Sequence, residues 1–143
     1  MIHSILIGDA NRSSSAFHAR LLQQAGYKVA TAHDMTAISA QLRLSVVSLV
    51  IAELALPEPG SGDAVNLVRR VATLRPGTPI LVLTSSTDPA LHRKARALGV
   101  WDISTKPTVC AELLSLTKNI LDAVYPEGSD FSVNCWRSRR LEG

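Results

Sequence analysis

Four side chains in this sequence have the chemical types needed to handle a phosphoryl group: Asp9, Glu53, Thr84 and Lys106. Each lies at or just after the end of a short run that reads as a buried strand. Carboxylates bind cations, a hydroxyl donates and accepts hydrogen bonds, and an ammonium group neutralises phosphate charge. A carboxylate such as Glu53 at the end of a buried strand is costly unless it has a partner or a function. We therefore treat these four residues as the candidate site.

Plainer interpretations of the same residues remain open. Asp9 stands where it could cap the first helix, and Thr84 could be an ordinary hydroxyl at a strand end. Glu53 and Lys106 could be solvated loop charges. The histidines share no ligand spacing, so we expect no common role for His3, His18, His33 and His92.

The elements that must position these residues alternate along the chain. Short apolar runs predict strands, and stretches with apolar residues at helical spacing predict helices between them. The first helix is expected to bury Phe17, Leu21 and Leu22 on one face. The strands are expected at 4–7, 27–32, 46–53, 79–84 and 100–104, and the helices at 11–25, 34–44, 63–74, 88–99 and 108–125.

Start and stop residues support these helices. Asn11, Asp34 and Thr108 are side chains that cap helix N-termini, and Asp88 is a cap followed by a proline. Gly26 is expected to end the first helix.

Five strand–helix units with continuous apolar strands predict one α/β domain, a doubly wound (βα)5 fold with a parallel sheet and helices on both faces. Ligands of such sheets bind beyond the carboxyl ends of the strands. Asp9, Glu53, Thr84 and Lys106 all fall at that edge, which is the main reason for grouping them.

Length and composition agree with a single domain. We expect the domain to cover residues 1–125 and residues 126–143 to form a flexible tail or linker, ending in an expression remnant or a cut point before a further domain. No apolar run approaches the ~18 residues of a membrane span. No signal peptide is recognisable, and Cys110 and Cys135 form no metal or disulfide pattern, so we expect a cytoplasmic protein without membrane contact.

The chain resembles the receiver domain of bacterial two-component response regulators over about residues 3–125. The resemblance implies a CheY-like, flavodoxin-like sheet in the order 2-1-3-4-5 and a signalling module that is not an enzyme. It rests on four segments taken together: residues 5–11, 49–57, 80–85 and 105–107.

The resemblance also implies a site. In the family, two acids after the first strand hold Mg²⁺, an aspartate after the third strand accepts the phosphoryl group, and a Ser/Thr and a lysine complete the set. Asp9, Thr84 and Lys106 match this pattern. Ala10 replaces the second acid, Glu53 replaces the acceptor, and Ile103 replaces the aromatic switch residue.

These departures predict a degenerate receiver. Without a carboxylate at Ala10, any Mg²⁺ held by Asp9, Glu53 and the Ala55 carbonyl should be weak or absent, and no other cofactor is implied. Glu53 is one methylene too long for the acceptor geometry, so phosphotransfer should be all but lost. We expect Glu53 to pair with Lys106 instead, as a partial imitation of the phosphorylated state.

Function is then expected to run through protein–protein contacts. Arg93, Arg96, Trp101 and Ile103 mark a face formed by the fourth helix, fifth strand and last helix, suited to a protein partner, an output domain or a homodimer. We expect a histidine kinase to bind at most without phosphotransfer. Two alternatives remain: a working phosphoacceptor receiver, and a nucleic-acid-binding module using the basic fourth helix and the tail. If the chain is a receiver domain, DNA contact would come only through a further output domain.

Overall fold

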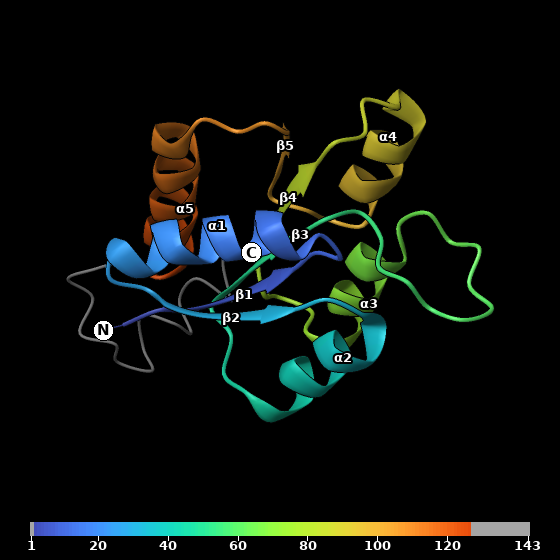
Figure 1. The fold of residues 1–143 in the computed structure, drawn as a ribbon, viewed down its shortest axis with the longest axis horizontal. Coiled ribbons are helices and arrows are strands. Elements are labelled where there is room, and N and C mark those ends of the chain that lie inside the picture. Colours follow the sequence, from blue (N-terminus) through green and yellow to red (C-terminus); the bar gives the residue numbers. More distant parts are fainter. Residues whose placement is uncertain (1, 127–143) are drawn as a thin grey trace.

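The computed structural model describes residues 2–126, so the expected tail lies outside the described residues except for Pro126. Strands and helices alternate strictly in the order that the sequence predicts (Figure 1). The strands are β1 Ser4–Gly8, β2 Lys28–Ala32, β3 Leu49–Ala52, β4 Ile80–Thr84 and β5 Asp102–Thr105. The helices are α1 Arg12–Gln24, α2 Met35–Leu44, α3 Asn66–Leu74, α4 Pro89–Ala97 and α5 Cys110–Val124.

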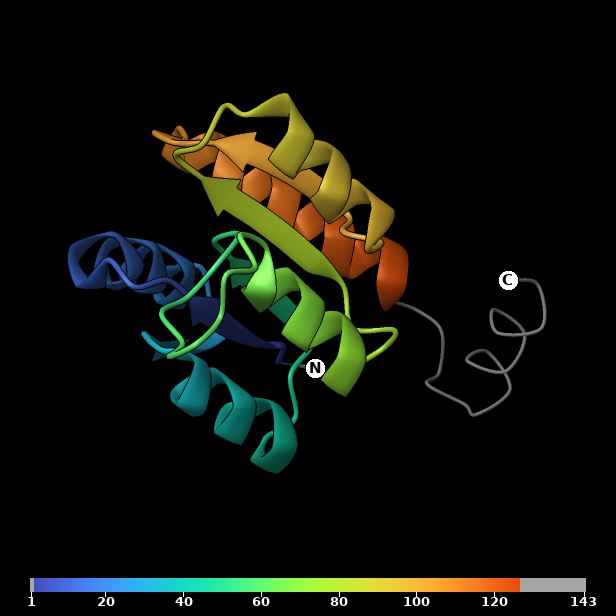
Figure 2. The ribbon, with the colours of Figure 1, turned by 90° about the vertical axis from the view of Figure 1, so that its right-hand side faces the viewer.

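The five strands form one parallel sheet in the order β2-β1-β3-β4-β5, which confirms the predicted fold class. Helices cover both faces of this sheet (Figure 2). One apolar cluster joins the sheet to α2, α3 and α4, and the other joins it to α1 and α5. Because β1 and β3 are buried on both faces, they read as continuous apolar runs rather than alternating ones.

The helix caps follow the sequence signals in three of four predicted cases. The side chains of Asn11, Asp34 and Asp88 accept hydrogen bonds from backbone N–H groups in the first turns of α1, α2 and α4. The prediction for Thr108 is wrong: α5 has Val109 as its N-cap residue, without a side-chain cap. The Thr108 hydroxyl lies 3.2 Å from the Ser104 hydroxyl instead, so it ties β5 to the segment before α5.

The predicted buried face of α1 is confirmed for Leu22 and for Leu21, which packs against the core, but it is wrong for Phe17. Phe17 is 56% exposed, whereas His18 is only 7% exposed, and Ala19 and Leu22 are buried with it. The imidazole of His18 therefore occupies a position that the apolar residues alone did not reveal.

Close packing surrounds the end of β1. A Cβ atom added to Gly8 would lie 3.1 Å from Ile38 Cδ1 of α2 and 3.1 Å from Leu67 Cδ2 of α3. Contacts this short require a neighbour to shift, so the backbone immediately before Asp9 is held by two helices.

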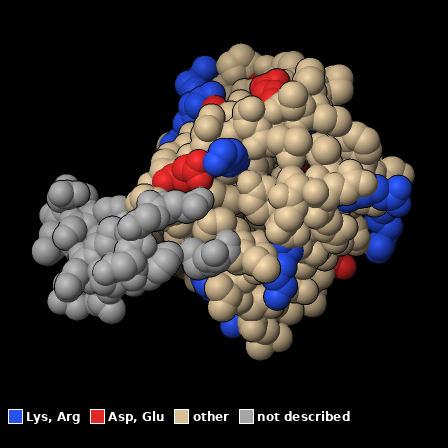
Figure 3. Space-filling model, turned by 90° about the vertical axis from the view of Figure 1, so that its left-hand side faces the viewer, with Lys and Arg blue, Asp and Glu red and all other residues tan. Residues whose placement is uncertain are grey.

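Charged side chains on one face of the molecule are dispersed. Figure 3 shows Lys and Arg side chains in several separate places, some beside Asp or Glu, rather than in one continuous basic area. None of the helices among residues 2–126 is long and apolar enough to cross a membrane.

Candidate functional site

The order of the sheet brings the four candidate residues to one edge. Asp9 and Glu53 directly follow β1 and β3, Thr84 is the last residue of β4, and Lys106 directly follows β5. These four strands are neighbours in the sheet and run parallel, so their carboxyl ends meet. The Lys106–Pro107 peptide bond is cis.

Lys106 is bound mainly by Asp9. The ammonium Nζ donates a hydrogen bond of 2.6 Å to Asp9 Oδ2, and its distance to Glu53 Oε2 is 3.5 Å. The side chains of Lys106 and Asp9 are 15% and 8% exposed, against 21% for Glu53. The expected pair of Glu53 with Lys106 is present, but it is the longer and more exposed of the two ion pairs.

Asp9 is fixed by a second contact. Its other carboxylate oxygen, Oδ1, accepts a hydrogen bond of 2.9 Å from the backbone N–H of Asn11, the N-cap residue of α1. The carboxylate thus connects the start of α1 with the lysine after β5. Both oxygens of Asp9 are engaged within the protein.

Glu53 turns its carboxylate back toward the protein. Oε1 accepts from the backbone N–H of Leu54 at 3.1 Å, and Oε2 accepts a long hydrogen bond from the backbone N–H of Ser85 at 3.4 Å. With Lys106 nearby, one carboxylate oxygen therefore faces an ammonium group and a backbone N–H from two different strand ends.

Thr84 is buried and faces its own loop. Its Oγ1 accepts a hydrogen bond of 3.0 Å from the backbone N–H of Ser86, and its carbonyl accepts from the backbone N–H of Lys106. Among the hydrogen bonds of residues 2–126, none joins the Thr84 hydroxyl to Glu53 or Lys106.

The oxygen ligands that the site offers to a cation are the carboxylates of Asp9 and Glu53. Mg²⁺ takes octahedral oxygen ligands and is usually held by one or two carboxylates together with waters and phosphate. Ala10 offers no carboxylate, the Asp9 carboxylate is bound to an ammonium, and Ala55 lies in the loop two residues after Glu53. Within the described part of the chain, no three His, Cys, Asp or Glu side chains gather in a way that could hold a metal ion.

His18 is a neighbour of the site that the sequence analysis missed. Burial lowers the pKa of its imidazole, the Lys106 ammonium lowers that pKa further, and the Asp9 carboxylate opposes both effects. Burial and the lysine charge therefore both favour the neutral imidazole over the charged one. The missed signal was its position in α1, four residues before Leu22 and on the same helix face.

The sequence matches a known protein family over most of its length. Residues 5–118, well over half of the chain, match the family model of the response regulator receiver domain. The chain belongs to this family. It is 29% identical over 103 residues to the CAI-1 autoinducer sensor kinase/phosphatase CqsS of Vibrio cholerae serotype O1, and equally to the transcriptional regulatory protein ZraR of Salmonella typhimurium.

Both matches cover 72% of this chain but only 15% of CqsS and 23% of ZraR, so the chain spans less than a quarter of each relative. Among solved structures, a CheY-like receiver domain from Methanospirillum hungatei JF-1 superposes with a TM-score of 0.81. That match has 23% identity and covers 90% of this chain and 100% of the other, which supports the fold alone.

The face predicted for partner binding is partly solvent-exposed in this receiver. Arg93 and Arg96 are exposed on α4, and Trp101 is 50% exposed before β5. Ile103 differs, because it is partly buried and packs against the cluster that includes residues of α4. Ile103 thus has part of its side chain packed in the core, whereas Trp101 is half exposed.

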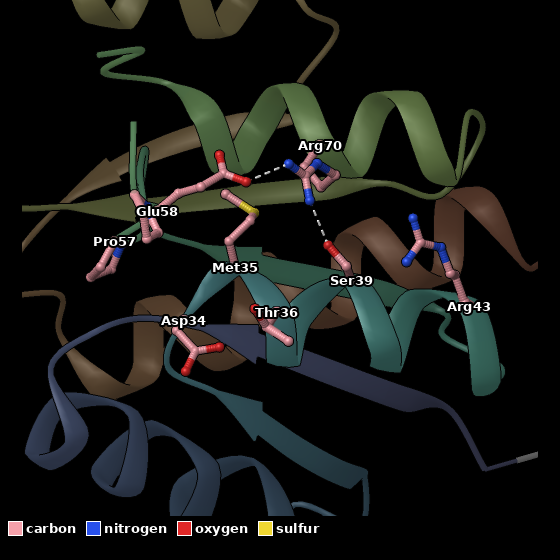
Figure 4. A pocket seen from close by; sticks show the side chains of 9 residues that line it. Asp34, Met35, Thr36, Ser39, Arg43, Pro57, Glu58 and Arg70 are labelled. Carbon is pink, nitrogen blue, oxygen red and sulfur yellow. Dashed lines mark hydrogen bonds and ion pairs between the residues drawn. The ribbon is translucent and has the colours of Figure 1, made fainter. Parts of the chain in front are cut away.

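A separate cavity of about 760 Å³ lies between α2 and the loop that follows β3 (Figure 4). Arg70 crosses it, donating 2.7 Å hydrogen bonds to Glu58 Oε2 and to the buried Ser39 hydroxyl. These contacts tie α3 to α2 and to the loop. Asn66, which sequence reasoning also missed, fixes the same loop by exchanging two hydrogen bonds of 2.8 Å with the backbone of Leu56.

Proposed function

We propose that this receiver works through protein–protein contacts without accepting a phosphoryl group. The observation that carries the proposal is the position of Lys106, whose ammonium lies 2.6 Å from Asp9 and 3.5 Å from Glu53. The cation needed to meet an incoming phosphoryl group is thus already neutralised by two carboxylates of the protein.

The acceptor chemistry is unfavourable for two further reasons. A glutamate at position 53 carries its oxygens about 1.5 Å beyond those of an aspartate, and a misplacement of ~1 Å can cost about a hundredfold in rate. Phosphoryl transfer also depends on metal ions that neutralise the developing charge. We propose that Mg²⁺ binding here is weak or absent, because Ala10 removes one carboxylate and Lys106 competes for Asp9.

Glu53 supplies part of what a phosphorylated site would have. Its Oε2 faces Lys106 and accepts from the Ser85 N–H, which places a negative charge between two strand ends. A carboxylate carries one charge, compared with ~2 for a phosphate, and has fewer acceptor oxygens. Glu53 therefore imitates the phosphorylated site only in part.

Output is proposed to pass through the face formed by α4, β5 and α5. The exposed Arg93, Arg96 and Trp101 offer two guanidinium groups and a large aromatic ring, which are residue types enriched in protein interfaces. The partner is a second protein, an output domain or a second copy of the chain. A histidine kinase would bind without transferring phosphate.

Mass spectrometry after incubation with acetyl phosphate and Mg²⁺ tests the proposal. We expect an unchanged mass for the natural sequence. The matched control is the double variant Ala10→Asp with Glu53→Asp, which restores both family carboxylates and should gain one phosphoryl group. A phosphate-sized gain in the natural sequence that is lost in Glu53→Gln would overturn the proposal and favour a working phosphoacceptor. Salt-dependent DNA binding by the chain itself would favour the nucleic-acid alternative.

A further inference from the structure

The loop between β4 and α4 is short and polar, and most of its backbone N–H groups donate hydrogen bonds to side chains. Residues 85–88 are Ser-Ser-Thr-Asp, and all except Ser86 are exposed. The Ser85 N–H donates to Glu53 and the Ser86 N–H donates to Thr84 Oγ1. The Asp88 N–H donates to Ser86 Oγ at 3.2 Å. Ser85 thus connects the loop to Glu53, and Ser86 connects it to Thr84 by the shorter hydrogen bond, 3.0 Å against 3.4 Å.

A side chain from α4 reaches back to the same residue. His92, half-buried in the first turns of α4, places its Nε2 2.7 Å from the Ser86 carbonyl oxygen. A carbonyl oxygen only accepts hydrogen bonds, so Nε2 must carry the proton. This is the shortest of the hydrogen bonds made by Ser86, and it closes a ring between residues 86 and 92.

We propose that His92 is a positioning residue that links the Thr84 hydroxyl to α4 through Ser86. Thr84 holds the N–H of Ser86 at 3.0 Å, and His92 holds its carbonyl at 2.7 Å. A rotation of the Thr84 side chain toward the site must either break its bond to Ser86 or move Ser86, and moving Ser86 moves the group to which His92 is bonded.

This chain of hydrogen bonds connects the site to α4, a connection that Ile103 is poorly suited to make. Ile103 is β-branched, partly buried and packed against the core, so it has little freedom to report a change at the site. The hydrogen bonds between Thr84 and Ser86 and between Ser86 and His92 instead end on α4, the helix that carries Arg93 and Arg96. This role of His92 rests on the proposed function, because it names the side chain that ties α4 to the site. It does not require that phosphotransfer be absent.

Variants of His92 test the proposal by NMR. His92→Leu removes the donor, His92→Gln keeps an N–H donor at a similar reach, and Lys94→Leu is the matched control at an exposed position of α4 outside the proposed partner face. A net hydrogen bond of ordinary strength predicts about fivefold faster water exchange of the Ser86 and Asp88 amide protons in His92→Leu. We expect His92→Gln to retain most of the protection and Lys94→Leu to leave these exchange rates unchanged. Urea titration first confirms that each variant is folded.

Coupling is measured by a second substitution. Thr84→Val should shift the amide resonances of residues 92–97 when His92 is present, and these shifts should largely disappear in His92→Leu. Equal shifts in both backgrounds, unchanged amide exchange in His92→Leu, or equal losses in the Leu and Gln variants would each overturn the role of His92. A mass gain with acetyl phosphate would sink the proposed function alone, since it leaves these readouts untouched.

Discussion

Removing the ammonium of Lys106 should lower the free energy of unfolding mainly because Asp9 loses its partner. The loss of the Glu53 contact should contribute much less. In Lys106→Met, Asp9 is left as an 8% exposed carboxylate with only the Asn11 N–H as a donor. Breaking a buried ion pair by deleting one partner typically costs ~3–5 kcal/mol. Because Glu53 remains nearby but gains no cation, we expect Lys106→Met to lower the free energy of unfolding by about 3 kcal/mol.

Double-mutant cycles separate the two carboxylates. The Asp9–Lys106 contact is a charge-assisted hydrogen bond at 2.6 Å, for which we expect a coupling free energy of about 2–3 kcal/mol. The Glu53–Lys106 contact is longer than a hydrogen bond, at 3.5 Å, and Glu53 is 21% exposed. Solvent screening should limit its coupling to roughly 1 kcal/mol or less.

The assay is urea unfolding at neutral pH followed by far-ultraviolet circular dichroism. It needs the single variants Asp9→Asn, Glu53→Gln and Lys106→Met and the two doubles that contain Lys106→Met. Asparagine and glutamine keep the shape and remove the charge, so packing changes little. If Glu53 couples to Lys106 as strongly as Asp9 does, then the lysine is not committed to Asp9, and our account of the site is refuted.

Two further substitutions test the surroundings of the site and the core. Thr117 is fully buried, and its hydroxyl has no hydrogen-bond partner among the described residues, so Thr117→Val should raise the free energy of unfolding by about 1 kcal/mol; a lower urea midpoint would contradict this. His18 has a lowered pKa in the folded state, so the unfolded chain binds its proton first as pH falls. Stability should therefore decrease from about pH 6.5 downward until the folded pKa is passed, and His18→Gln should flatten that decrease in urea midpoints measured across this range; equal slopes would show that another group is responsible.

The fold was predictable because its signals are local. Apolar runs, caps such as Asn11 and Asp34, and the Asp88–Pro89 pair each depend on a few adjacent residues. Grouping Asp9, Glu53 and Lys106 was also predictable, since parallel strands bring their carboxyl ends together. Which carboxylate binds the lysine more tightly was not, because that choice depends on side-chain reach and burial at tenths of an ångström.

Other features depended on packing that periodicity does not encode. Phe17 and His18 are adjacent in α1, and only the docking of the helix on the sheet decides that the imidazole is buried and the ring exposed. Asn66 and His92 act through backbone groups 10 and 6 residues away, and a polar residue with such a role has no distinctive sequence pattern. Thr108 had the type of a helix cap, but its hydroxyl lies beside the Ser104 hydroxyl instead.

Close packing at Gly8 makes the Asp9–Lys106 ion pair depend on two fully buried side chains, Ile38 and Leu67. Ile38 and Leu67 are buried against the backbone one residue before Asp9, so closely that a Cβ atom on Gly8 would lie 3.1 Å from each side chain. A substitution that lets either side chain shift moves the strand end, and with it the carboxylate that holds Lys106. Substitutions that weaken the Asp9–Lys106 ion pair should therefore be found at buried aliphatic residues of α2 and α3 as well as at the two charged residues themselves.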